Sequence, residues 1–250
     1  MSRGLKLVLA LSLLGNLSIA YVGYKAWEYR SHINHFRDKY LRVIDEFSQR
    51  DFYRAANDSL PPPSPARPRI ILFGTQVMAR WPAPAFGDGF EIVNRGVTGQ
   101  RAAGFLLRFK SDVLDLRPSA VIIEISSYNL RPELRREEIQ DYVVLMAGLA
   151  RLHGIEPILT TPVPLLEGAD PVGGYALRDS LTAYCEWVRA YADVHSYRLL
   201  DMAHLLADER GHLRSEWAQD AIDPDPDGYR ILSRAAVALL DSVLIRADKQ

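Results

Sequence analysis

Cysteine is almost absent from this chain of 250 residues. The one thiol, Cys185, has no internal partner for a disulfide and cannot by itself supply a cysteine-based zinc site. We expect it to pack within a helix, as free cysteines commonly do. A dense cluster of lysine and arginine is also missing. Because nucleic-acid binding requires many phosphates to be neutralised, this excludes a dedicated nucleic-acid binder.

The formal net charge of −1 conceals two unlike regions. Residues 1–68 hold ten Lys or Arg against six Asp or Glu, whereas residues 69–250 hold twenty against twenty-five. The sequence therefore predicts a basic N-terminal part and an acidic globular part. A core of this size is near the upper limit for one domain.

Charge is absent from residues 7–24. As a helix this stretch is about 27 Å long, close to the thickness of the bilayer hydrocarbon. We therefore predict a single-pass transmembrane anchor over residues 1–24. Arg3 and Lys6 precede it, so the N-terminus should be cytoplasmic and the rest of the chain outside the cytoplasm, in the periplasm. Ser18 and Ala20 also fit a cleavage site, which leaves a signal peptide as the alternative.

Glycine and proline are absent from residues 25–57, which predicts one amphipathic helical stalk. Apolar side chains recur there with heptad-like spacing, at Tyr29, Ile33, Phe36, Tyr40, Val43 and Phe47. We expect this stripe to contact other membrane-protein subunits. It could instead dock on the C-terminal domain or continue the anchor.

Prolines interrupt regular structure in residues 58–68, which predicts a linker. After it, apolar runs at 69–73, 91–93, 120–125, 155–160 and 198–200 predict strands. The stretches 102–114, 134–153, 175–192 and 228–245 predict helices. This alternation predicts an α/β domain over residues 69–250, with a five-stranded parallel sheet covered by helices on both faces. Ligands of such sheets bind at the carboxyl ends of the strands.

Four segments at or beyond these strand ends are IILFGTQVMARW, IVNRGVTGQ, VIIEISSYNL and DAIDPDPDGYRIL. In this order and spacing they resemble the SGNH (GDSL-like) hydrolase family. The resemblance covers residues 69–250 and implies a flavodoxin-like three-layer sandwich. It also implies ester chemistry at four conserved blocks.

The residues that would carry that chemistry are largely replaced. Gln76 stands where the family has its nucleophilic serine, Tyr128 where an asparagine completes the oxyanion hole, and Asp223 where a histidine acts as base. An amide is not a nucleophile, and an aspartate with a pKa of about 4 is a poor base for a hydroxyl. Gly99 and Asp220 match the family's oxyanion glycine and orienting aspartate. No catalytic set is therefore intact.

Relocated chemistry is a remaining alternative. Ser126 and Ser127 are hydroxyls at a strand end, and His204 is the histidine expected on the same rim. Asn129 could replace Tyr128 only if the strand end slipped by one residue, which would turn it to the other face. The acidic loop after Asp220 lacks the glycine and terminal glutamate of a calcium loop, so we predict no metal site and no cofactor. Asp227 should cap the last helix.

These observations predict a membrane-anchored pseudoenzyme that acts as a structural or binding subunit of a membrane-associated assembly. The alternative is an exported esterase or acyl transferase that acts on lipid or polysaccharide acyl groups through relocated residues. The residual cleft could also bind an acyl or glycan ligand without turnover.

Overall fold

The computed structural model describes residues 2–131, 134–171 and 174–247. The chain divides into two compact units, Met1–Phe47 and Ser48–Gln250. The first unit lies in one long helix, α1 (Arg3–Ser48). Among the described residues, α1 is the one helix long and apolar enough to cross a membrane. The side chains of Tyr29, Phe36 and Tyr40 on it are about two-thirds exposed.

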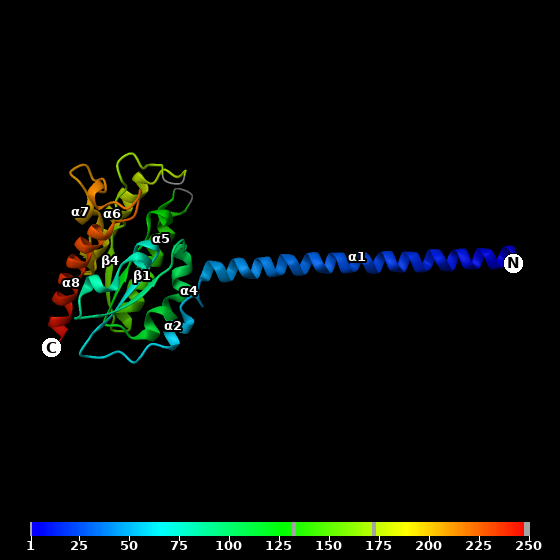
Figure 1. The fold of residues 1–250 in the computed structure, drawn as a ribbon, viewed down its shortest axis with the longest axis horizontal. Helices are drawn as coiled ribbons and strands as arrows, with labels where there is room; N and C mark the ends of the chain where they lie inside the picture. The colour runs from blue at the N-terminus through cyan, green and yellow to red at the C-terminus, as the bar shows by residue number, and fades with distance from the viewer. Residues whose placement is uncertain (1, 132–133, 172–173, 248–250) are drawn as a thin grey trace. The chain divides into compact units, whose positions relative to one another are not determined.

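The second unit contains a five-stranded parallel sheet, as the sequence predicts (Figure 1). Its strands are β1 (Arg69–Gly74), β2 (Glu91–Gly96), β3 (Ala120–Ile123), β4 (Glu156–Thr160) and β5 (Arg198–Leu200), in the order β2-β1-β3-β4-β5. In the sheet, β1 lies between β2 and β3, so the chain leaves β1 toward one edge to form β2 and then returns to the other side of β1 to form β3. The direction of the connections therefore changes at β1. The carboxyl ends of β1, β2 and β3 therefore form the crevice where sheets of this kind bind ligands.

Helices cover both faces of the sheet (Figure 1). Ile71 and Phe73 face a core with α4 (Ala102–Asp112), α5 (Arg136–Leu152) and α6 (Arg178–Val194). Ile70 and Leu72 face a second core with α3 (Gln76–Arg80), α7 (Met202–Leu206) and α8 (Pro226–Ala247). Successive strand residues point to opposite faces, so a strand of consecutive apolar residues supplies both cores. The predicted three-layer sandwich is confirmed.

Short elements complete the domain. The helix α2 (Arg54–Asp58) precedes the sheet. Four 3₁₀ turns, which the apolar pattern did not predict, are η1 (Ala83–Phe86), η2 (Leu114–Leu116), η3 (Ser127–Leu130) and η4 (Ser215–Trp217). The segment 58–68, predicted as a linker, is irregular after Asp58, but it packs on the domain and does not mark the boundary between the two units. Leu60 contacts the core, and Arg69 donates to the carbonyl of Pro61 at 2.6 Å.

The predicted helical stalk over 25–57 is wrong in its C-terminal part. The helix α1 ends at Ser48, and Gln49 adopts a left-handed backbone conformation with φ 49°. Beyond it, the Tyr53 hydroxyl donates to the Gly96 carbonyl at 2.5 Å. Asn57 donates to the Asp112 carboxylate at 2.7 Å. Residues 48–58 therefore belong to the α/β domain, because their polar side chains find partners there rather than along a continued helix.

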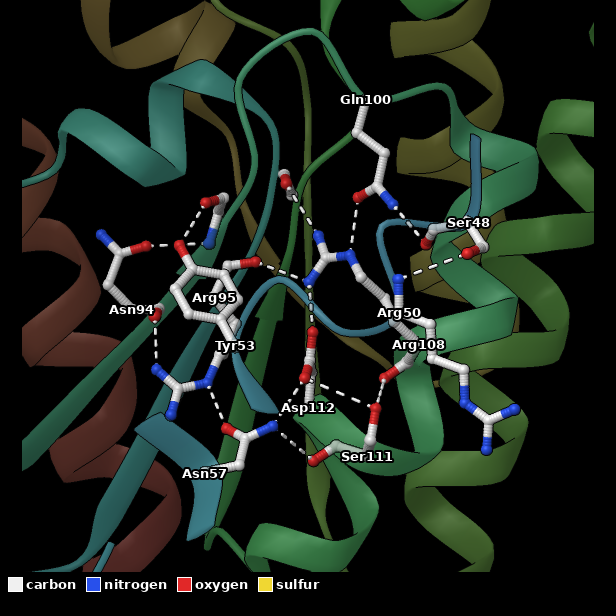
Figure 2. Close-up of polar contacts among 12 residues, drawn as sticks. Ser48, Arg50, Tyr53, Asn57, Asn94, Arg95, Gln100, Arg108, Ser111 and Asp112 are labelled. Carbon is white, nitrogen blue, oxygen red and sulfur yellow. Dashed lines mark hydrogen bonds and ion pairs between the residues drawn. The ribbon is translucent and has the colours of Figure 1, made fainter. Parts of the chain in front are cut away.

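The group that organises this region is the guanidinium of Arg108 in α4, which is fully buried (Figure 2). It donates to the Asp112 carboxylate at 3.0 Å and to the Gln100 amide oxygen at 2.6 Å. It also donates to the carbonyls of Arg95 at 2.8 Å and Gly74 at 3.2 Å. One buried charge thus connects the carboxyl ends of β1 and β2 with α4.

The same network holds the segment that follows α1. Gln100 donates to the Ser48 carbonyl at 3.1 Å. Asn57 lies between Asp112 and Arg95, and its amide oxygen accepts from Arg95 at 2.8 Å. The Arg95 guanidinium covers the ring of Tyr53 at 4.6 Å. Figure 2 shows these side chains converging on Arg108 and Asp112 from three separate parts of the chain.

The substitution Asp112→Ala should destabilise the protein by about 3–5 kcal/mol, because it leaves the charge of Arg108 buried without its partner. Asp115→Ala is the matched control, since Asp115 pairs with Lys110 at the exposed surface. It should cost less than about 1 kcal/mol. Denaturant unfolding of the full-length variants measures both values. Equal losses of stability in the two variants would contradict the conclusion that the Arg108–Asp112 pair holds this region together.

Candidate functional site

The two positions that the resemblance assigns to a nucleophile and a base, Gln76 and Asp223, lie side by side after β1 and before α8. Gln76, the first residue of α3, donates its side-chain amide to both carboxylate oxygens of Asp223, at 3.0 and 3.1 Å. Asp223 is 1% exposed and also forms an ion pair with Arg80. The two groups therefore satisfy each other's polar atoms, with Arg80 as the balancing charge.

This arrangement offers neither a hydroxyl nor an imidazole at the reacting positions. Burial raises the pKa of Asp223, and the hydrogen bond from Gln76 opposes that rise. Asp220, expected as the orienting partner of a base, accepts instead from the backbone N–H groups of Ile222 and Asp223, each at 3.0 Å. Asp220 thus closes the turn that presents Asp223.

Glu124, at the end of β3, is a buried acid that the sequence reasoning missed. It accepts from the backbone N–H of Thr75 at 2.6 Å and from the Thr75 hydroxyl at 3.0 Å. Complete burial raises its pKa from 4.5 to about 7. A Cβ on Gly74 would lie 2.4 Å from the Glu124 carboxylate, so glycine is required there. The one signal in the sequence was a lone acid inside the apolar run VIIEIS.

A cavity of about 250 Å³ lies at the carboxyl ends of β1, β2 and β3. Gln76, Gly99 and Tyr128 all line it, so three of the five predicted positions meet there. Gly99 has φ +76°, a left-handed conformation that favours glycine at this turn. Tyr128 is 36% exposed. The structure therefore places the Tyr128 ring at the edge of the cavity, on the turn η3.

Asn129 lines the same cavity as Tyr128 and is buried. It is 3% exposed, its amide oxygen accepts from the Ala102 N–H at 2.7 Å, and its amide nitrogen donates to the Gln100 carbonyl and the Ser126 hydroxyl. The expectation that Asn129 could replace Tyr128 only after a one-residue slip of the strand does not apply, because β3 ends at Ile123 and residues 127–130 form a 3₁₀ turn. Strand alternation does not apply to such a turn.

The residues considered for relocated chemistry are not brought together. Ser126 lines the 250 Å³ cavity, whereas His204 lines a separate cavity of about 380 Å³ beside α6 and α7. Ser127 is buried at the start of η3. The backbone N–H of His204 donates to Asp201, which is paired with Arg189. None of the hydrogen bonds among the described residues joins either serine to His204.

Cys185 is buried in α6, as predicted, and burial raises the pKa of its thiol to about 11. The thiol is therefore protonated at neutral pH.

The acidic loop before α8 divides its carboxylates among local structural roles. Asp225 accepts from the Gly228 N–H at 2.8 Å and so caps α8. The expectation that Asp227 is the cap was wrong, since Asp227 is already inside the helix, where it pairs with Arg230. Within the described ranges, no three of the acidic, histidine and cysteine side chains group as metal ligands would.

Comparison with known proteins identifies the family. A sequence model described as GDSL-like Lipase/Acylhydrolase family matches residues 55–231. The chain belongs to the GDSL-like lipase/acylhydrolase family. The match begins inside α2, in agreement with the finding that this helix is part of the domain.

Solved structures of other proteins share the fold. A GDSL-like lipase from Bacteroides thetaiotaomicron has a TM-score of 0.69 and 24% identity, covering 80% of this chain and 99% of its own. An acetylxylan esterase from Geobacillus stearothermophilus, solved as a catalytic mutant, has a TM-score of 0.56 and 17% identity, covering 69% of this chain and 94% of its own.

Among curated proteins, the uncharacterized lipoprotein YqeF of Bacillus subtilis (strain 168) is 32% identical over 84 residues. The match covers 31% of this chain and 35% of that protein, so it spans about a third of the relative's length.

Glu124→Gln should make the stability of this family member less dependent on pH. The folded state holds the proton of Glu124 more tightly than the unfolded chain, so the protonated form stabilises the fold. This contribution is complete below pH 4.5 and is lost as the pH rises to about 7. The rise in pKa corresponds to about 3 kcal/mol.

The free energy of unfolding, measured between pH 4.5 and 8, should therefore fall by about 3 kcal/mol more in the wild type than in Glu124→Gln. Asp223 is present in both proteins, so the comparison measures the titration of Glu124 together with its interaction with Asp223. If the free energy of unfolding changed with pH in the same way in both proteins, Glu124 would not be the group that titrates.

Proposed function

We propose that this protein is a membrane-anchored member of its family that no longer catalyses hydrolysis and serves as a binding subunit of a membrane-associated assembly. The observation that carries the proposal is the direct hydrogen bonding of Gln76 to Asp223, backed by Arg80. In an ester hydrolase these two positions must supply a nucleophile and a base. Here they stabilise each other instead.

The N-terminal helix supports the membrane location. α1 is apolar over a length that can cross a bilayer, and Arg3 and Lys6 precede its uncharged stretch. By the positive-inside rule the N-terminus is cytoplasmic, and the α/β domain lies in the periplasm. The similarity to a protein named as a lipoprotein is in keeping with a family branch that works at membranes.

The stripe on α1 supports a protein partner. Tyr29, Phe36 and Tyr40 are each about two-thirds exposed, and Phe47 is 37% exposed. By their spacing they lie along one side of α1, in the charged part of the helix that follows its apolar stretch. Aromatic side chains repeated at heptad spacing form the kind of seam that a second helix covers.

The charges beside the stripe indicate what that partner is. Arg30 and Arg37 lie on one flank of the seam, and Lys25, His32 and Lys39 lie on the other, which carries Glu46 near its C-terminal end. In a parallel second copy of α1, Lys25 of one helix would face Arg30 of the other, and like charges at such positions oppose pairing. The favoured partner is therefore a helix of a different protein with acidic residues beside its own apolar seam.

An active-site fluorophosphonate probe should leave the full-length protein unlabelled, because position 76 carries an amide. The acetylxylan esterase from Geobacillus stearothermophilus with its catalytic residues intact is the positive control. Labelling that disappears in Ser126→Ala, Ser127→Ala or Thr75→Ala would overturn the proposal and favour an exported esterase or acyl transferase with relocated residues.

A photo-crosslinking amino acid at Phe36 should capture a second protein in native membranes, at several times the yield obtained from position 27. Trp27 is the matched control, because it is an exposed aromatic residue nine positions away, on the opposite side of α1. Sequencing of the cross-linked peptide should show a helix with Asp or Glu beside its apolar positions.

Charge reversal tests the same contact. The double substitution Arg37→Glu and Lys39→Glu should lower the cross-link yield at least fivefold. Cross-links to a second copy of this chain, or to lipid alone, would contradict the proposed partner.

A further inference from the structure

The cavity at the carboxyl ends of β1, β2 and β3 is rich in hydrogen-bond donors, and none of the described residues that line it is acidic. Two arginines contribute to it, Arg101 from the loop before α4 and Arg131 from the end of η3. The other residues that line it are uncharged: Thr75, Gln76, Gly99, Gln100, Ser126, Tyr128 and Asn129. The described part of the wall therefore carries positive charge alone.

The polar groups behind this wall are already paired among themselves. Two acids contact residues of this wall: Asp223 is held by Gln76 and Arg80, and Glu124 accepts twice from Thr75. Arg80 thus balances the charge of Asp223, and the Glu124 carboxylate is occupied by Thr75. Asn129 uses its whole amide group on Ala102, Gln100 and Ser126, and so it builds the wall without competing for a ligand.

Two donors remain available. The Ser126 oxygen accepts from Asn129, which leaves its hydroxyl proton free to point to another acceptor. The Nε atom of Arg131 is buried and has no hydrogen-bond partner in the described part of the chain. The Arg131 guanidinium lies over the ring of Tyr175 at 4.7 Å, which fixes its plane. A buried charged donor without an acceptor is costly, so an acceptor oxygen at this place would stabilise the protein.

We propose that this cavity binds an oxyanion, a phosphate or carboxylate group, with Arg131 and Arg101 as the charged donors and Ser126 as a neutral donor. A guanidinium matches such groups because it presents parallel N–H donors to two oxygens. This inference goes beyond the proposed function, since neither the loss of catalysis nor the partner helix names a ligand. It also narrows the expected acyl or glycan ligand to one that ends in an acidic group.

Binding of inorganic phosphate to the full-length protein in phosphatidylcholine nanodiscs tests the proposal by isothermal titration calorimetry. Saturable binding should be weakened at least tenfold by Arg131→Gln and by Arg101→Gln. Arg234→Gln removes the same charge from an exposed position on α8 and should leave the affinity unchanged.

Arg101 is exposed, so its substitution should not disturb folding and remains informative if the Arg131 variant is unstable. The proposal is overturned by absence of saturable binding, or by equal affinity in the wild type and both cavity variants. Loss of binding equal to that in Arg234→Gln would also overturn it, since that result indicates attraction by net charge alone.

The source of the anion is decided by a second titration with a soluble short-chain phosphatidylglycerol. Affinity at least tenfold higher than that for inorganic phosphate supports the site and assigns it to a lipid headgroup. Affinity equal or lower supports the site and assigns it to a free phosphate or a phosphorylated glycan. Neither titration depends on turnover, so failure of this proposal is distinguishable from failure of the proposed loss of catalysis.

Discussion

A buried guanidinium is the constraint on which the architecture of this protein depends. Arg108 is removed from water, and a buried charge must be surrounded by acceptors. It finds them in Asp112, in Gln100 and in the carbonyls that end β1 and β2. The strand ends that form the candidate site are therefore positioned by one side chain. The same requirement makes residues 48–58 part of the domain, because Asn57 and the Ser48 carbonyl complete the network.

The residues of this chain that match the family pattern each have a structural role here. Gly74 leaves room for the carboxylate of Glu124, Gly99 allows a left-handed turn, and Asp220 closes the turn before Asp223. The positions that differ are those whose ordinary role is chemical. By the resemblance, Gln76 and Asp223 stand at the positions of a nucleophile and a base, and here they form a hydrogen-bonded pair beside a crevice of about 250 Å³. Such a crevice remains suited to holding a ligand.

The sheet and its large helices followed from the sequence, because apolar runs and helical periodicity are local signals. The positions of side chains whose partners are distant in the sequence could not be predicted in this way. Tyr53 and Asn57 continue the helical pattern of residues 25–57, but they bond to Gly96 and Asp112, about 40 to 55 positions away. Arg108 gave no sign that it is buried, and for Glu124 the one sign was its place inside an apolar run, since the burial of both depends on groups from several elements. The place of Asn129 depended on where β3 ends, and element boundaries are poorly defined by propensity.

The central claim is that the reacting positions of this fold carry no ester chemistry. The most direct measurement is the rate of p-nitrophenyl acetate hydrolysis by the full-length protein between pH 5 and 9. The account predicts the rate of buffer alone at every pH, unchanged by Gln76→Ala or Ser126→Ala. Turnover above the buffer rate that is lost on either substitution would contradict it.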